Sequence, residues 1–258
     1  MLLLSGFLNK SRYLLLACSV LLATNATAAE VRIAVASNFT AAMQQLAEQF
    51  SAVSGHSTKL IFGSTGKHYA QIKHGAPFDA FFAADVKRPQ LLEQEGIAVV
   101  NSRFTYAVGK VVLWSPDASL VDEEGKVLQS ERFHYLAMAN PKLAPYGRAA
   151  QQIMEQAGVW PGLRSRTVRG ENIGQTFQFV RSGNAQLGFV AYSQLKSLPD
   201  AGGSLWLPDL NSYTPIRQQA VLLKDTPAAQ QFMQFVQSPA GAEIIARYGY
   251  DSTTDNGQ

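Results

Sequence analysis

VRIAVASNFT, residues 31–40, is a short apolar strand that runs directly into a polar turn and then into a helical pattern. The first N–H groups of a helix have no partner inside the helix, and the helix dipole places a partial positive charge at the same end. Ser37 and Asn38 add neutral hydrogen-bond donors at the turn. The segment therefore has the chemistry of a cradle for a small anion that needs no charged side chain.

The residues before this strand have the pattern of a cleavable export signal. A basic start is followed by an apolar run, residues 13–23, and by the A-x-A cleavage site Ala26-Thr27-Ala28. An apolar run of 11 residues is too short to cross a bilayer as a helix. We expect residues 1–28 to be a signal peptide, with cleavage after Ala28 or Ala29.

The only cysteine of the chain, Cys18, lies inside this apolar run. Processing at Cys18 as a lipoprotein would leave only residues 13–17 as the apolar core of the signal, so we favour ordinary cleavage. The mature chain then has no cysteine, and a packed core rather than disulfides must stabilise it.

The composition is that of a compact globular protein, with 47% hydrophobic and 16% charged residues. About 230 residues remain after cleavage, enough for one large or two medium domains. The formal charge of +3 falls to about +1 when the two basic residues of the leader are removed, which argues against a nucleic-acid partner. An exported, soluble chain without cysteine or lipid anchor indicates the bacterial periplasm.

Strand and helix patterns alternate along the first part of the mature chain. Each apolar strand ends in a turn, and the helix that follows has apolar residues three and four positions apart. This βαβαβα order favours a parallel sheet with helices on both faces. The predicted strands are residues 31–36, 59–62 and 79–83, and the predicted helices are residues 40–51, 67–74 and 89–95.

The pattern changes at residues 104–114, where two extended segments flank Gly109. We interpret this as a crossing into a second lobe, with a return crossing at residues 215–223. The expected lobes are residues 29–106 for lobe 1, residues 107–218 for lobe 2, and residues 219–258 for the return to lobe 1. In the second half, strands are predicted at 133–139, 166–169 and 187–191, and helices at 148–157, 175–182, 227–236 and 239–247.

Polar residues stand where several of the predicted strands end. Because open α/β sheets bind ligands at the carboxyl ends of their strands, we expect these residues to meet in a cleft between the lobes. They are Ser37, Asn38, Ser64, Thr65, Tyr146 and the pair Asn172-Ile173.

A fully ionised tetrahedral oxyanion presents only hydrogen-bond acceptors, so its ideal pocket contains only donors. The four hydroxyls of this set, the Nδ2 group of Asn38 and the main-chain N–H groups after each strand can supply them. A carboxylate would repel such a dianion and would suit hydrogen phosphate instead. Glu171 at the fourth turn is the one acidic residue at these positions, and we expect it to point outward.

Each residue of the set also has a simpler structural role available. Ser37 or Thr40 can cap a helix, Ser64 and Thr65 can form a turn, and Tyr146 can pack in a core. Taken together, at matching positions in two lobes, these residues favour ligand binding over a purely structural role.

The sequence carries no spacing typical of a catalytic or metal site. His68 and His74 do not share a helix face, and the other two histidines stand alone, so we expect all four to be solvated or hydrogen-bonded. An exported hydrolase with Ser37 or Ser64 as nucleophile is the alternative from another class, and it would need a histidine within hydrogen-bond reach. A G-x-S-x-G motif is absent from the sequence.

Five blocks of sequence together resemble a known family, the periplasmic molybdate-binding proteins of ABC-type uptake systems. Their order and spacing carry the resemblance, which extends over nearly the whole mature chain. The Ser37-Asn38 pair is similar to a branch of the family with asparagine after the first hydroxyl residue. The blocks are AVASNFTAAMQQLAEQF (34–50), FGSTGKHYAQIKHGAPFDAFFAAD (62–85), NPKLAPYGRAA (140–150), RGENIGQTFQFVRSGNAQLGFVAYS (169–193) and SPAGAEIIARYGY (238–250).

The resemblance implies a two-lobed periplasmic binding protein fold of type II, in which each lobe is a mainly parallel sheet flanked by helices and two segments cross between the lobes. It implies a protein that is not an enzyme, uses no cofactor, and delivers molybdate or tungstate to a membrane ABC permease. The metal would be bound only as the oxyanion. We expect a monomer without a nucleic-acid partner.

By matching motifs, the resemblance implies a set of ligand-binding residues. In some members a tyrosine follows the strand that matches residues 187–190, but here Ala191 takes that place and Tyr192 comes one residue later. Either Tyr192 or Tyr146 would therefore complete the site. The implied donors are Ser37, Asn38, Ser64, Thr65, Tyr146, Ile173 through its main-chain N–H, and Tyr192.

Two alternatives stay close to this interpretation. One is a receptor for another tetrahedral oxyanion such as sulfate, which has the charge and shape of molybdate but is smaller. The other is an anion-sensing partner of a membrane receptor without a transport role. The sequence does not rank molybdate against tungstate, because the two ions are nearly the same size.

Overall fold

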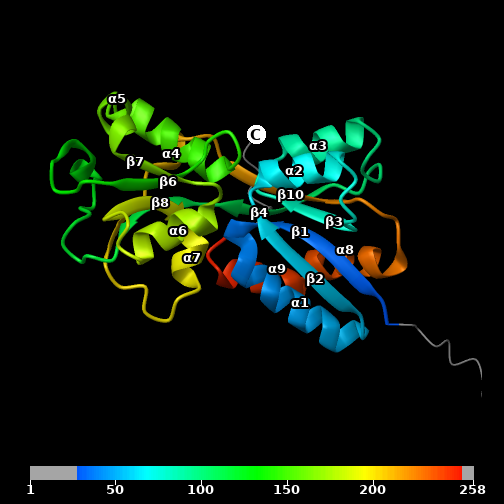
Figure 1. The fold of residues 1–258 in the computed structure, drawn as a ribbon. Helices are drawn as coiled ribbons and strands as arrows, with labels where there is room; N and C mark the ends of the chain where they lie inside the picture. The colour runs from blue at the N-terminus through cyan, green and yellow to red at the C-terminus, as the bar shows by residue number, and fades with distance from the viewer. Residues whose placement is uncertain (1–27, 252–258) are drawn as a thin grey trace, which may run out of the picture.

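The protein has two lobes side by side, each built around a five-stranded sheet (Figure 1). The computed structural model describes residues 28–251, so the predictions for the export signal and Cys18 lie outside the described residues. The order of strands is β2-β1-β3-β10-β4 in the first sheet and β7-β6-β8-β5-β9 in the second. The α/β two-lobed fold expected from the sequence is confirmed.

In the first sheet four strands run in one direction and one strand runs in the opposite direction. β1 (Glu30–Ala36) pairs in parallel with β2 (Ser57–Gly63) and β3 (Ala80–Ala83). β10 (Ile216–Leu222) is antiparallel to β3 and to β4 (Phe104–Gly109). Figure 1 shows α2 (Thr65–Lys73) and α3 (Lys87–Gln94) on one face of this sheet, and α1 (Thr40–Ser54), α8 (Pro227–Gln237) and α9 (Pro239–Arg247) on the other.

The second sheet has the same combination of parallel and antiparallel strands. β6 (Leu136–Ala139) is parallel to β7 (Thr167–Gly170) and β8 (Leu187–Ala191). β5 (Val111–Ser115) is antiparallel to β8 and to β9 (Ser204–Trp206). The helices of this lobe are α4 (Pro145–Gln156), α5 (Trp160–Leu163), α6 (Ile173–Arg181) and α7 (Tyr192–Lys196).

The chain crosses between the sheets at Lys110, which separates β4 from β5, and returns after β9 into β10. The last described residue, Asp251, lies at the same junction. Its main chain pairs with Val108 at the end of β4, and its carboxylate accepts a hydrogen bond from Lys110 Nζ at 2.6 Å. Both crossings and the end of the described chain therefore meet between the lobes.

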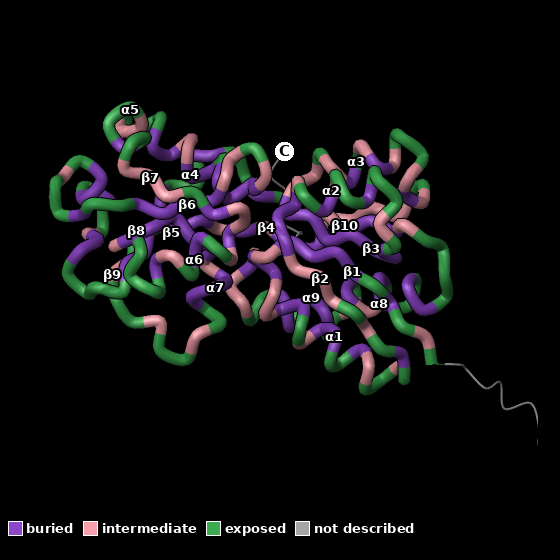
Figure 2. Tube along the Cα trace, in the orientation of Figure 1, coloured by how far each residue is buried: buried purple, intermediate pink, exposed green. Residues whose placement is uncertain are grey.

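Each lobe has an apolar core of its own strands and helices. In Figure 2 the strands at the centre of both lobes are buried, and the outer faces of the helices are exposed. Phe39, Phe82 and Phe232 belong to the core of the first lobe, and Leu113, Met138 and Phe189 to that of the second. Each of these side chains is fully buried, which contributes on the order of 2 kcal/mol per side chain. No helix within residues 28–251 combines the length and apolar character needed to cross a membrane.

Four helices, α2, α3, α4 and α6, begin two or three residues earlier than their apolar pattern predicts. Ser64 caps α2 by accepting from Lys67 N at 3.3 Å, and Asn172 caps α6 by accepting from Gln175 N at 3.0 Å. Pro145 starts α4, where its missing N–H costs nothing. As a result Thr65, Tyr146 and Ile173 lie in the first turns of helices, which is where unpaired N–H groups are found.

Candidate functional site: an inter-lobe cavity lined by hydroxyls

A small cavity with an empty volume of about 180 Å³ lies where the two lobes meet. It is lined by residues from the ends of β1 and β2 in the first lobe and from the starts of α4 and α6 in the second. The residues that line it include no lysine, arginine, aspartate or glutamate. Six of the predicted site residues are among them, namely Ser37, Asn38, Ser64, Thr65, Tyr146 and Ile173.

The four hydroxyls at this cavity share one arrangement, in which each oxygen accepts a hydrogen bond from a fixed N–H donor. Within residues 28–251, none of the four donates its own hydrogen to a protein acceptor, so that hydrogen is free for a ligand. The accepted bonds are Gly174 N to Ser37 Oγ at 3.1 Å, Lys67 N to Ser64 Oγ at 3.3 Å, Ala84 N to Thr65 Oγ1 at 3.1 Å and Gln218 Nε2 to the Tyr146 hydroxyl at 3.4 Å.

Main-chain donors add to these hydroxyls. Asn38 follows the end of β1, while Thr65 and Ile173 are the first residues of α2 and α6. Their N–H groups make no hydrogen bond to another part of the described chain. Helix starts from both lobes therefore present N–H groups and the positive ends of their dipoles to one cavity.

The expected donor at Asn38 needs correction. Its side-chain Nδ2 donates to Gln218 Oε1 at 2.7 Å and to the Tyr250 hydroxyl at 3.0 Å. An amide group has two such hydrogens, and both are thus used inside the protein. Asn38 can serve a ligand through its main-chain N–H, while its side chain holds neighbouring residues in place.

The structure places Tyr192 outside this cavity, so it is removed from the candidate ligands. Tyr192 is the first residue of α7, and its main-chain N–H donates to Lys110 O at 2.9 Å. Its ring lies under Lys196, with the ammonium nitrogen 5.4 Å from the ring centroid. Because β8 ends at Ala191, the tyrosine one residue later starts a helix instead of closing the site.

Tyr146 is the most deeply buried of the hydroxyl residues, with 1% of its surface exposed. Burial raises the pKa of its phenol well above the ordinary value, and the nearby tyrosines 250, 106 and 213 add to this shift. The hydroxyl therefore keeps its hydrogen at neutral pH, as a hydrogen-bond donor must.

Charged residues lie at the mouth of the cavity rather than inside it. Lys67 and Glu171 form an ion pair of 3.0 Å from one lobe to the other, and about half of each side chain is exposed. The expectation that Glu171 points outward is confirmed. Such an exposed pair contributes little free energy, about 0–1 kcal/mol. The lobes are also joined by hydrogen bonds from Gly66 N to Leu143 O at 2.9 Å and from Arg88 Nη2 to Lys142 O at 3.0 Å.

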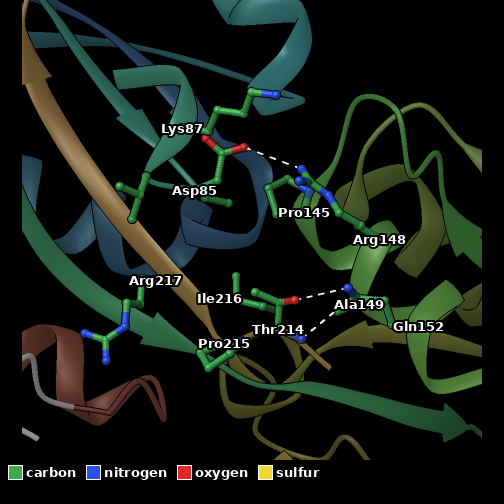
Figure 3. Close-up of a pocket in the computed structure, with 12 residues that line it drawn as sticks. Asp85, Lys87, Pro145, Arg148, Ala149, Gln152, Thr214, Pro215, Ile216 and Arg217 are labelled. Atoms are coloured by element: carbon green, nitrogen blue, oxygen red, sulfur yellow. Dashed lines mark hydrogen bonds and ion pairs between the residues drawn. The ribbon is translucent and has the colours of Figure 1, made fainter. Parts of the chain in front are cut away.

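A larger cavity, with an empty volume of about 790 Å³, lies on the other side of Ala84 and Pro145. Figure 3 shows Asp85 and Arg148 facing each other in it, with nitrogen and oxygen 3.7 Å apart, and Gln152 hydrogen-bonded to Thr214. Arg88 pairs with Asp85 as well. The Asp85 carboxylate in this cavity would repel a dianion, so size alone does not make it the better candidate.

His68 supports the cavity from behind, since its Nε2 lies 3.2 Å from Val35 O and its Nδ1 lies 3.2 Å from Gln71 Oε1. It is thus a hydrogen-bonded core histidine, as expected from the sequence. Histidine, cysteine and acidic side chains do not gather in groups of three that could hold a metal ion within the described residues.

We expect the stability of the protein to fall as the pH drops below about 6.5, and His68 to be one cause. Burial is the main reason that its pKa lies below the ordinary value. As the pH falls, this histidine is therefore protonated in the unfolded chain before it is protonated in the folded one. The free energy of unfolding decreases between the unfolded pKa of about 6.5 and the lowered folded pKa, by at most about 1.4 kcal/mol per pH unit. Thermal unfolding of His68→Gln against pH would have a smaller slope in this window, and an unchanged slope would contradict the assignment.

Two residues of the site were missed by sequence reasoning. Gln218, in β10, bonds both Asn38 and Tyr146. Gly109, at the end of β4, lies against the Tyr146 hydroxyl, because a Cβ built there would be 2.1 Å from that oxygen. Gln218 is one of three consecutive polar residues in β10, 217–219, so the sequence did not single it out. The sequence around Gly109 does not indicate that this residue contacts Tyr146.

Comparison with known proteins gives a consistent family. The family model of bacterial extracellular solute-binding proteins matches residues 31–251. The molybdate-binding protein ModA of Azotobacter vinelandii is 50% identical over 234 residues, covering 89% of this chain and 93% of the relative. ModA of Rhodobacter capsulatus is 45% identical over 232 residues, covering 89% and 91%.

Solved structures agree with this result. The periplasmic molybdate-binding protein of A. vinelandii superposes with a TM-score of 0.83 at 42% identity, covering 86% of this chain and 98% of that one. The sulfate-binding protein SubI of Mycobacterium tuberculosis has a TM-score of 0.74 at 12% identity, covering 88% of each chain, and shares the fold alone. Because the family model and the relatives span almost all of the described residues, the chain belongs to the bacterial extracellular solute-binding proteins.

Proposed function

We propose that this protein is a periplasmic binding protein that captures molybdate between its lobes and delivers it to a membrane ABC permease. The observation that carries the proposal is the inter-lobe cavity with four hydroxyls whose oxygens already accept hydrogen bonds. The hydrogen of each such hydroxyl is still available to donate to a guest, and a fully ionised tetrahedral oxyanion can only accept. Relatives named as molybdate-binding proteins, up to 50% identical, support the choice of ion.

The proposed ligand set is Ser37, Ser64, Thr65 and Tyr146 through their hydroxyls, and Asn38 and Ile173 through their main-chain N–H groups. Donors from both lobes would surround one ion, so binding and lobe closure would be coupled. The crossings near Lys110 and Pro215 would act as the hinge. The permease would contact both lobes of a monomeric protein and thereby recognise the closed form.

Discrimination against sulfate would come from size. Donors held by main-chain N–H groups and helix starts cannot contract around a smaller ion. Each buried donor left without a good acceptor costs about 1–3 kcal/mol, so two loosened bonds lower affinity by roughly 100-fold. Tungstate is nearly the size of molybdate, and we propose that it binds comparably well.

Titration calorimetry with molybdate, tungstate, sulfate and phosphate tests this proposal. We expect one ion per protein, similar affinity for molybdate and tungstate, and at least about 100-fold weaker binding of sulfate, since several donors lose their acceptors. Hydrogen phosphate should bind weakly as well, because the residues that line the cavity offer no carboxylate for its proton. Sulfate binding as tight as molybdate binding would refute the size argument.

An exported hydrolase finds little support in the geometry. A serine nucleophile needs a base that takes its proton. Ser37 and Ser64 are bonded to main-chain N–H groups, and His68 is engaged with Val35 and Gln71. Among the described residues, no histidine is hydrogen-bonded to either serine.

A further inference from the structure

Gln218 lies between the two lobes at the place where their polar residues meet. It belongs to β10, the strand on which the chain returns from the second lobe, and its side chain is fully buried. Its Oε1 accepts from Asn38 Nδ2 at 2.7 Å and lies 3.1 Å from the Tyr106 hydroxyl, whose one hydrogen also has Ala83 O at 3.1 Å. Its Nε2 donates to the Tyr146 hydroxyl at 3.4 Å.

These contacts fix the orientation of the Gln218 amide. The Asn38 amide presents its NH₂ end, because the Tyr250 hydroxyl that it also contacts at 3.0 Å donates its own hydrogen to Asn38 O at 2.8 Å. The end of the Gln218 amide that faces Asn38 is therefore the carbonyl oxygen. The NH₂ end then faces Tyr146, and the phenol oxygen must accept there. The hydrogen of the Tyr146 hydroxyl is consequently directed elsewhere, which leaves it for a guest in the cavity.

Gly109 restricts the hydroxyl from another side. A Cβ built on Gly109 would lie 2.1 Å from the Tyr146 oxygen and 2.7 Å from Gln218 Nε2. The main chain at the end of β4 thus lies in contact with both groups. The phenol oxygen is held between a glycine and an amide, with little room to turn.

Tyr146 differs in this respect from the other three hydroxyls. The donors to the other hydroxyls, those of Ser37, Ser64 and Thr65, are main-chain N–H groups. A substitution of the donor residue leaves such a group in place unless the new residue is proline. Tyr146 accepts from a side chain. A single substitution at Gln218 can therefore change which way one hydroxyl of the site points.

We propose that Gln218 is a positioning residue that keeps the Tyr146 hydroxyl as a hydrogen-bond donor to the bound oxyanion. The inference deepens the proposed function and rests on it. Gln218 acts through Tyr146 and does not touch the ion. It also ties the ligand site to the crossing strand, since the same amide bonds Asn38 in the first lobe and Tyr146 in the second.

A double-mutant cycle with molybdate as the probe tests this role. Calorimetry compares the whole mature protein with Gln218→Met, Tyr146→Phe and the double variant. Each single change should weaken binding about tenfold, because each removes or misdirects the same charge-assisted hydrogen bond. The double variant should bind within about threefold of Tyr146→Phe, since the amide has no hydroxyl left to orient. An effect near 100-fold in the double variant would overturn the inference.

Gln219→Met is the matched control. Gln219 is the next residue of β10, and its side chain bonds Arg103 and Thr105 rather than Tyr146. It should change molybdate affinity by less than about twofold, as expected for a site without shared partners. A loss in this variant as large as that of Gln218→Met would show a general effect of altering β10 and would overturn the inference.

Gln218→Glu keeps the size of the side chain and guards against a variant that does not fold. A glutamate still accepts from Asn38 but offers Tyr146 an oxygen, so the phenol turns its hydrogen away from the ion. Binding should weaken at least about tenfold, and affinity within twofold of the unchanged protein would overturn the inference. If the unchanged protein binds none of the oxyanions, the proposed function fails and this inference with it. If it binds molybdate but the losses of affinity in the two single variants multiply in the double variant, the role of Gln218 is refuted and the proposed function stands.

Discussion

Replacing Gly109 with alanine is expected to weaken molybdate binding by about 100-fold or more, the largest effect of any single substitution considered. The new methyl group would lie 2.1 Å from the Tyr146 oxygen, a distance that no real contact allows. The tyrosine ring is fully enclosed, so it cannot move aside without disturbing its lobe. Losing one charge-assisted hydrogen bond costs about 1.5–3 kcal/mol, and repacking of the enclosed ring adds to this.

The measurement is molybdate titration of Gly109→Ala beside Gly162→Ala. Gly162 lies in α5 with nothing within 4 Å of a built Cβ, so the same chemical change there meets open space. The control should bind like the unchanged protein. Thermal unfolding without ligand shows whether each variant is folded. Equal affinity in the two variants would mean that the Tyr146 hydroxyl has no part in binding.

Ser37→Ala is expected to weaken molybdate binding by about 10- to 100-fold while the protein stays folded. The substitution removes one hydrogen-bond donor to the ion. It also leaves Gly174 N without the oxygen that it reaches at 3.1 Å from the other lobe. An unpaired buried N–H costs about 1–3 kcal/mol, and this cost arises only when the lobes are closed. The loss should therefore appear in ligand affinity rather than in the stability of the ligand-free protein.

Calorimetry and ligand-free thermal unfolding of Ser37→Ala test this separation. Ser182→Ala is a suitable control, because the Ser182 hydroxyl is exposed and donates only to Phe179 O of its own helix. The account of the cavity would be wrong if Ser37→Ala bound molybdate as well as the control does. A large fall in melting temperature without ligand would instead assign Ser37 a structural role.

Local rules were enough to find much of the fold and most of the candidate site. Each strand-to-helix turn of the site joins a strand, a capping residue and a helix within about ten residues. Its chemistry can therefore be predicted from the local sequence pattern. That is why the predicted hydroxyls and Ile173 line a single cavity. α9 has the predicted bounds, 239–247, because Ser238 and Pro239 mark its start unambiguously.

Contacts between distant segments were not readable in this way. Asn38 and Gln218 are 180 positions apart, and Gln218 and Tyr146 are 72 apart. Whether their side chains meet depends on the register of β10 and on how closely the lobes approach. The Asn38 side chain was therefore assigned to the ligand although it bonds protein groups. Tyr192 was considered because its sequence position is only one residue from the strand end.

The meeting of both crossings and Asp251 between the lobes has a practical consequence for reporters of ligand binding. Asp251 is fastened to Val108 and Lys110, so a dye fixed at this residue would sit at the pivot and travel little when the lobes move. A pair of fluorophores on the outer ends of α3 and α5, which Figure 1 places far apart on opposite lobes, would register the motion much better. A biosensor should therefore carry its labels on these helices.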